Sequence, residues 1–292
     1  MKLPDSCFAN HEFMSYAVVN SNSAILLFAD LVIIIDSSGN KLYQRNINRN
    51  APTHDSTSIY FYGPMGNFFP PFYEPRLNRL YLPRYRIDCD WWEPSWYNGS
   101  PLAYLDLKTD SFHPANVRYP EAFKNHYYGD LIEASQLLTD SFNDVYFWGS
   151  NLFQRYNRFT GSKVEYPLRL EGLKSEWVPY VGDPIDIQKK MDHLKRNPWL
   201  LGVHYHPKSR SYLAICSDGV PDVVNGKYTS FDDRALVINT YNESFKWISS
   251  YRFEGIKTGL LANIHEDTLY VYSGNTKVGN NTGLRFHRFL LH

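Results

Sequence analysis

The chain has 292 residues, enough to bury a large hydrophobic core within one domain. Its 30 basic and 30 acidic side chains give a formal net charge of zero, with no block of like charges, which argues against binding to nucleic acid or to an anionic membrane. Tyrosine (23) and phenylalanine (18) are abundant, and this favours β-strands.

The N-terminal part of the chain predicts strands. The first apolar run, residues 24–35, is interrupted by Asp30 and is too short for a membrane helix, so we expect no transmembrane segment. Residues 1–7 lack the apolar core of a signal peptide. The three cysteines have no CxxC spacing, which favours unpaired thiols over disulfides or a zinc site. They are Cys7, Cys89 and Cys216.

A short aromatic strand recurs along the chain at a nearly constant interval. Its copies lie at 79–82, 144–147, 211–214 and 268–271. Each copy contains one tyrosine, and these are Tyr81, Tyr146, Tyr212 and Tyr270. The repeat length of about 60 residues is typical of β-propeller blades. It predicts that the four tyrosines occupy equivalent positions in successive blades.

A second strand completes each repeat. Its copies lie at 32–36, 102–106, 153–157, 236–239 and 284–287. Four run into polar turns of the kind that close hairpins, at 37–40, 107–110, 158–161 and 240–243. We predict a single all-β domain over 1–292, a β-propeller of antiparallel four-stranded blades. Five blades are visible; a sixth requires strands from residues 1–24, and otherwise the domain is N-terminally incomplete.

One segment has helical periodicity. Residues 184–196 carry apolar side chains at Ile187, Met191 and Leu194, through which we expect the helix to pack. Asp183 is a suitable N-cap, Pro184 suits the first turn, and Pro198 marks the end. The sequence therefore predicts one helix inserted between the third and fourth units.

The turns between the strands support a family resemblance. Tyr-x-Pro-basic turns occur at 73–76 and 205–208, beside the aromatic strands and Asp-x-x-x-Asp/Gly hairpins. Over roughly residues 24–292 the chain resembles the TolB-like six-bladed β-propellers, and in particular a family of uncharacterised bacterial propeller lipoproteins. The resemblance implies six blades and an extracytoplasmic location in the cell envelope. It supplies no site residues.

The long loops indicate where a site would lie. In a four-stranded up-and-down blade, the second-to-third-strand loops and the linkers between blades emerge at the same end. The loops at 87–100 and 218–234 are long, whereas the one at 148–151 is short. We therefore predict that the two long loops and the helix at 184–196 border a depression over the third blade.

The loop at 87–100 is the richest candidate site. It combines carboxylates with aromatic side chains, which suits stacking and hydrogen bonding to a polar ligand, or an interface with a protein. These residues are Asp88, Asp90, Trp91, Trp92, Glu93, Trp96 and Tyr97. Alternatively, the aromatic side chains fold back onto neighbouring loops. In the second loop, Asp218 and Asp222 are further candidates, or solvated acidic residues.

Other motifs give no catalytic or metal site. The acidic residues lack the spacing of a calcium loop, and His206 in His204-Tyr-His206 is better interpreted as a turn residue than as a metal ligand. We expect no cofactor and no metal. The leading hypothesis is a non-enzymatic binding propeller for a polar ligand or protein partner. The alternatives are a propeller hydrolase or lyase, acting on a carbohydrate or other polar substrate with carboxylates near the central funnel, and a degenerate copy without activity of its own.

Overall fold

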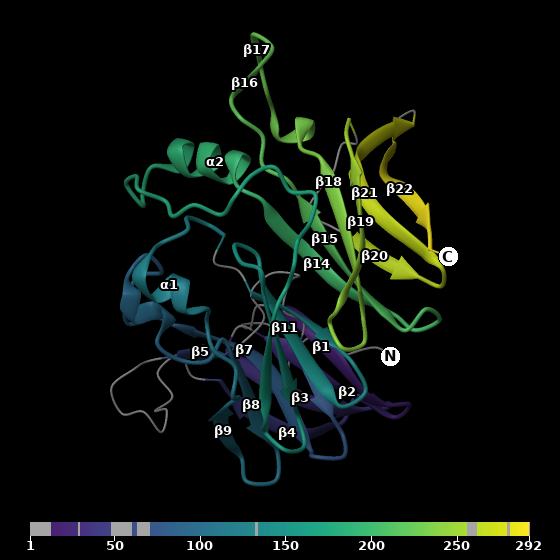
Figure 1. The fold of residues 1–292 in the computed structure, drawn as a ribbon. Coiled ribbons are helices and arrows are strands. Elements are labelled where there is room, and N and C mark those ends of the chain that lie inside the picture. Colours follow the sequence, from purple (N-terminus) through teal and green to yellow (C-terminus); the bar gives the residue numbers. More distant parts are fainter. Residues whose placement is uncertain are drawn as a thin grey trace. The chain divides into compact units, whose positions relative to one another are not determined.

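The computed structural model describes residues 13–28, 30–47, 60–62, 71–131, 134–255, 262–278 and 281–291. Five antiparallel sheets and a small two-stranded hairpin hold the strands of these residues (Figure 1). The chain divides into two units, residues 1–119 with 157–163 and residues 120–156 with 164–292.

The first unit contains two sheets. One has the order β1-β2-β3-β4, with the strands Phe13–Asn20, Ser23–Phe28, Leu31–Asp36 and Lys41–Asn46. In the other, β5 and β6 pair with different parts of β7, which is followed by β8 and β9. These strands are Tyr60–Tyr62, Phe72–Glu74, Arg79–Arg86, Leu102–Asp106 and Ser111–Pro114.

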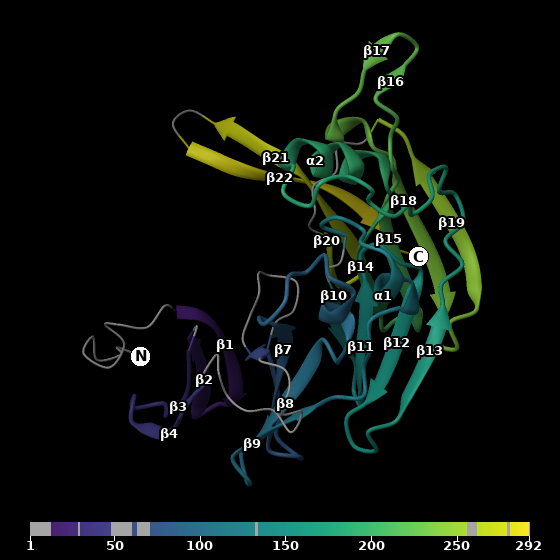
Figure 2. The same cartoon turned by 90° about the vertical axis from the view of Figure 1, so that its left-hand side faces the viewer.

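The second unit contains the remaining sheets. The sheet β10-β11-β12-β13 has its strands side by side in chain order in Figure 2, at Ala134–Leu138, Phe142–Phe147, Leu152–Asn157 and Lys163–Pro167. The next has the order β14-β15-β18-β19, at Trp199–His206, Ser211–Ser217, Leu236–Asn242 and Trp247–Phe253. The last is β20-β21-β22, at Ala262–His265, Thr268–Val278 and Asn281–Leu290. The hairpin pairs β16 (Val223–Val224) with β17 (Lys227–Tyr228).

Helices are few in the described residues. The α-helices are α1 (Glu121–Asn125) and α2 (Ile187–Arg196), and the 3-10 helices are η3 (Pro94–Tyr97) and η4 (Phe231–Asp233). The fold class is therefore the predicted one, an all-β chain with the antiparallel four-stranded sheets of a β-propeller and one longer inserted helix. Cys89 and Cys216 are free thiols, and Cys7 lies outside the described residues.

The inner strands are apolar because both faces of their sheets are covered. In β2, Ile25 and Leu27 belong to one buried cluster, whereas Leu26 and Phe28 belong to another. A strand that is buried on both faces has apolar residues at successive positions, whereas a half-buried strand alternates between apolar and polar residues. Burial on both faces therefore explains the apolar run at residues 24–35. The fourth strand β4 alternates between exposed and half-buried residues.

The hairpins after the third strands share one local structure. Asp36, Asp106, Asn157 and Asn242 each use a side-chain oxygen to accept hydrogen bonds from backbone N–H groups that follow in the turn. In such Asx turns the side chain takes the place of a strand partner for the backbone N–H groups, which favours the end of the strand at this position. The predicted turn at 240–243 is placed too early, because β18 continues to Asn242 and the turn follows it.

The four repeat tyrosines do not all occupy equivalent positions. In β7, Arg79 pairs with Asp106 and Tyr81 lies two residues further on. In β15, Ser211 pairs with Asn242, the corresponding turn residue, and Tyr212 follows one residue later. Successive side chains of a strand point to opposite faces, so these two tyrosines differ in register by one residue and face opposite sides.

The inserted helix begins later than predicted, and of the three residues expected to pack only Leu194 is buried. Asp186 is the N-cap of α2 and accepts a hydrogen bond from the Lys189 N–H at 3.0 Å. The Asp183 side chain instead accepts from the N–H of Ile185 in the preceding turn.

The apolar spacing of the helix was misleading. Ile187 and Met191 are exposed, at 72% and 40%, whereas Lys190 and Leu194 are buried. Lys190 can be buried because its ammonium lies 3.3 Å from the Asp130 carboxylate.

Candidate functional site

The loop after β7 is fixed at its base by Arg86. Its guanidinium donates two hydrogen bonds to the Asp88 carboxylate, at 3.0 and 2.6 Å, and a third to the Ser95 carbonyl at 2.8 Å. Bidentate arginine–carboxylate pairs are among the stronger polar contacts in proteins. Asp88, a candidate ligand acceptor, is therefore engaged in holding its own loop.

Trp96 and Tyr97 form the interior of this loop. They lie in η3 and are buried, with 9% and 1% of their surfaces exposed. Trp96 Nε1 donates to the Arg86 carbonyl at 3.1 Å, and the Tyr97 hydroxyl donates to the Trp91 carbonyl at 2.7 Å. Both rings pack on Tyr119, at centroid distances of 5.4 and 5.3 Å. These two aromatic side chains therefore fold back onto the protein, and their rings are not accessible to a ligand.

The remaining loop residues form an exposed group, which we call the Trp91 surface: Asp90, Trp91, Trp92 and Glu93. Trp91 is 44% exposed and Trp92 is half-buried, and their rings meet edge to face at 5.7 Å. Both carboxylate residues are exposed. The backbone between them is closed by a hydrogen bond from the Glu93 N–H to the Asp90 carbonyl at 2.9 Å.

Asp218 lies in the second unit and is completely buried. Its oxygens accept hydrogen bonds from the N–H groups of Lys174 (2.8 Å) and Ser175 (3.1 Å), from the Ser175 hydroxyl, and from Arg252. Burial alone would raise the pKa of Asp218, but these donors hold it below its ordinary value. The carboxylate therefore organises the protein interior and is not a ligand acceptor.

Asp222 fastens its loop to the end of α2. Its carboxylate pairs with Arg196 and with the Lys195 ammonium, which lies at 2.7 Å. Hydrogen bonds from Arg196 and Lys195 hold the pKa of Asp222 below its ordinary value. Cations at the C-terminal end of a helix also interact favourably with its dipole. Asp222 therefore holds the 218–234 loop against the end of α2.

Arg234 is a buried residue that no sequence motif singled out. It is 3% exposed, and its guanidinium donates to the carbonyls of Asp218, Leu194, Asn197 and Ser217 at 2.5–3.1 Å. Burial lowers its pKa to about 9. Arg234 thus joins the end of α2 to the loop between β15 and β18, and the contact partners are too far apart in sequence to be found by local patterns.

The middle residue of the Tyr-x-Pro turn links different repeats. Glu74 is buried and lies 3.2 Å from Arg158, a residue of the turn after β12. At the matching position His206 is also buried, and its Nε2 lies 3.2 Å from Asp267 in the turn before β21. His206 is therefore the last residue of β14, directly before the turn at 207–210 and not within it as the sequence suggested, and its ring makes a structural contact.

The candidate residues fall into separate units. The Trp91 surface belongs to the first unit, whereas the 218–234 loop and α2 belong to the second. The shared face predicted for them remains a prediction. Within the described ranges no group of three or more histidine, cysteine or acidic side chains could hold a metal ion. No described helix has the length and apolar character needed to cross a membrane.

Comparison with known proteins identifies a fold. No family model and no curated protein matches the chain. Among solved structures, a member of the DUF4221 family from Bacteroides vulgatus is 16% identical, with a TM-score of 0.66 over 96% of this chain and 79% of that one. The β-propeller domain of Cps50 (Swd1) from Myceliophteria thermophila is 9% identical, with a TM-score of 0.39 over 96% of this chain and 76% of that one. Because its sequence identity is so low, the similarity to the Bacteroides protein concerns the fold alone.

Proposed function

We propose that the protein is a non-enzymatic binding module and that the Trp91 surface contacts its ligand. The observation that carries this proposal is the contrast within one loop. Trp96 and Tyr97 are buried, whereas Trp91 remains 44% exposed directly beside the carboxylates of Asp90 and Glu93. An exposed tryptophan held above a well-packed base is typical of a binding anchor.

The loop is pre-organised for this role. Arg86 closes its base and Trp96 and Tyr97 fill its interior, so the backbone under Trp91 is already ordered before a ligand arrives. Ordering a loop on binding costs free energy that is lost from the affinity. A fixed loop avoids most of this cost.

The chemistry of the Trp91 surface indicates a polar ligand with a flat apolar face. The indole ring of Trp91 offers such a ligand a stacking surface, and the Asp90 carboxylate accepts hydrogen bonds from hydroxyl or amide groups. The Glu93 carboxylate already accepts from the Ser95 hydroxyl at 3.3 Å and keeps further lone pairs for a ligand. A pyranose has both features, so glycans are the first probes, and peptides are the second. The buried carboxylates of Asp218 and Asp144 accept hydrogen bonds from arginine and other donors, so neither supports a hydrolase or lyase.

The resemblance to TolB-like propeller lipoproteins supports two finer proposals. The first is a six-bladed ring. The described strands form five antiparallel sheets of three to five strands each. The second is a location outside the cytoplasm, in the cell envelope. A surface that presents tryptophan and carboxylates to glycans or peptides would suit that location.

A binding screen tests the proposal. Glycan and peptide arrays are probed with the wild-type protein, with a Trp91→Ala/Trp92→Ala variant, and with Tyr228→Ala as a control that removes an aromatic ring 90% exposed in the second unit. We expect ligands that bind the wild type and the control but not the double variant. Undiminished binding by a folded double variant would exclude the Trp91 surface.

A further inference from the structure

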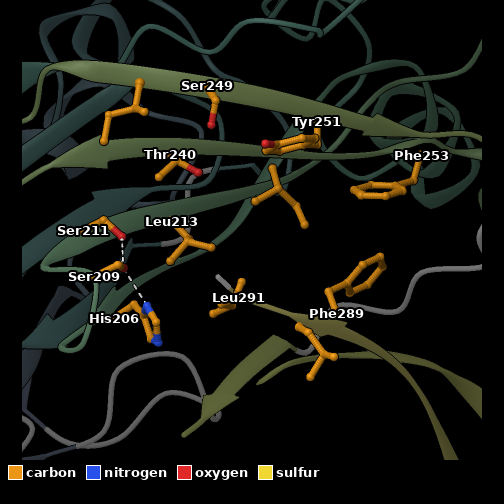
Figure 3. Close-up of a pocket in the computed structure, with 13 residues that line it drawn as sticks. His206, Ser209, Ser211, Leu213, Thr240, Ser249, Tyr251, Phe253, Phe289 and Leu291 are labelled. Atoms are coloured by element: carbon orange, nitrogen blue, oxygen red, sulfur yellow. Dashed lines mark hydrogen bonds between the residues drawn. The ribbon is translucent and has the colours of Figure 1, made fainter. Parts of the chain in front are cut away.

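A cavity in the second unit lies between the sheets β14-β15-β18-β19 and β20-β21-β22 (Figure 3). Its volume of about 590 Å³ lies within the range of about 300–1,000 Å³ that is usual for small-molecule sites. It does not involve the Trp91 surface, and its existence follows from no sequence motif.

The strand register places hydroxyl side chains at one end of a cavity wall and apolar or aromatic side chains at the other. Leu213 pairs with Thr240 and Thr240 with Ser249, so these residues form one row across three strands. In a parallel row nearer the other end of the strands, Ile238 pairs with Tyr251. Because side chains alternate along a strand, both rows point to the same face of the sheet.

One end of the cavity is apolar. Phe253 of β19 and Phe289 of β22 face each other there, with ring centroids 4.9 Å apart, and both appear at the same end in Figure 3. Ile238 forms the adjoining wall and is 5% exposed, and Leu213, 4% exposed, lies further along the cavity in the row of Thr240 and Ser249. These side chains would bury the hydrocarbon or aromatic part of a ligand.

The other end is rich in hydroxyl groups. The Ser209 hydroxyl is 2.6 Å from His206 Nδ1 and 2.6 Å from the Ser211 hydroxyl, a chain drawn as dashed lines in Figure 3. The His206 Nε2 already lies against Asp267. By contrast, the hydroxyls of Thr240 and Ser249 bond to no side chain or backbone group of the described residues, so they can still donate and accept.

We propose that this cavity binds a small amphipathic molecule with an apolar body and an uncharged, hydroxyl- or amide-bearing head. The body lies against Ile238, Phe253 and Phe289, and the head bonds to Thr240 and Ser249. An uncharged head fits better than an anion because the described lining contains no lysine or arginine, and both His206 nitrogens have partners.

Fluorescence of the neutral probe N-phenyl-1-naphthylamine tests the site. We expect a saturable increase in emission with the wild-type protein, reversed by octyl glucoside below its critical micelle concentration. Nonanoate has an alkyl chain of the same length but an anionic head, and it should displace the probe at least about tenfold less effectively. Equal displacement by the two would overturn the uncharged head.

Variants distinguish the cavity from surface adsorption. Tyr251→Ala removes a lining ring that is 59% exposed and should weaken binding of the probe about tenfold, whereas Tyr228→Ala removes an exposed ring elsewhere and should leave it unchanged. Thr240→Val removes one free hydroxyl with little change in shape, and should weaken octyl glucoside but not the probe. An absence of saturable binding, or unchanged affinities in Tyr251→Ala and Thr240→Val, would overturn the proposal. So would displacement by an extended apolar peptide but not by octyl glucoside, which would indicate a strand-binding groove.

Discussion

The residues of the 87–100 loop differ in role although they are similar in composition. Trp96 is buried against Tyr119 and bonded to the Arg86 carbonyl, whereas Trp91 is nearly half exposed. The sequence singled out this loop because carboxylates and aromatic residues gather in it. It could not separate the two tryptophans, since their burial depends on Tyr119, which is distant in the chain.

This difference predicts opposite effects of two truncations. Trp96→Ala should lower the free energy of unfolding by about 3–5 kcal/mol, because it leaves a cavity and an unpaired carbonyl. Trp91→Ala should cost no more than about 1 kcal/mol. Urea denaturation followed by circular dichroism measures both. Equal losses would mean that Trp91 is also part of the loop interior.

Asp218 predicts an acid-dependent loss of stability. Its folded-state pKa is lowered from 3.8, so the carboxylate stabilises the folded chain above that pH, and the contribution disappears as the pH falls through the folded-state pKa. Asp218→Asn should be less stable than the wild type at neutral pH and should lose less further stability below pH 3.8. Urea midpoints across this pH range test the prediction, with the exposed Asp90→Asn as control. Parallel pH profiles of wild type and Asp218→Asn would contradict it.

At the scale of single elements, the buried strands were the most predictable. Strands such as β2 and β3 are apolar on both faces, and their sequence signal is therefore strong. The start of α2 was predicted too early because Asp183 and Asp186 are both suitable caps, and only the folded backbone decides between them. Leu194 was correctly expected to pack, whereas the burial of Lys190 was missed because it depends on the pairing of its ammonium with Asp130.

The orientation of α2 gives a direct test. Leu194→Asp should destabilise the protein by about 3 kcal/mol or more, because it buries a carboxylate among apolar neighbours. Met191→Asp should change the stability by no more than about 0.5 kcal/mol, since Met191 is 40% exposed. Thermal unfolding of the two variants compares the same substitution on two sides of one helix. A larger loss in Met191→Asp would reverse the assigned orientation.

For the whole molecule, the repeat in the sequence predicted the sheets but not the register of every strand. The spacing of Tyr81 and Tyr212 suggested equivalence, yet they differ by one residue relative to their turn residues. A shift of one residue in a strand can be compensated by a loop of different length, so the spacing between repeats stays nearly constant. Contacts between repeats, such as Glu74 with Arg158, depend on packing between segments distant in sequence and carry no local signal.

In the proposed binding mode, a rigid loop presents Trp91 and Trp92 to a polar ligand. Isothermal titration with a glycan or peptide selected on the arrays tests it most directly, using the wild type, Trp91→Ala/Trp92→Ala and the control Tyr228→Ala. Loss of an anchoring aromatic typically costs about 2 kcal/mol or more, so we predict that the Kd of the double variant rises by at least about 30-fold while that of the control is unchanged. A Kd for the folded double variant equal to that of the wild type would contradict the claim.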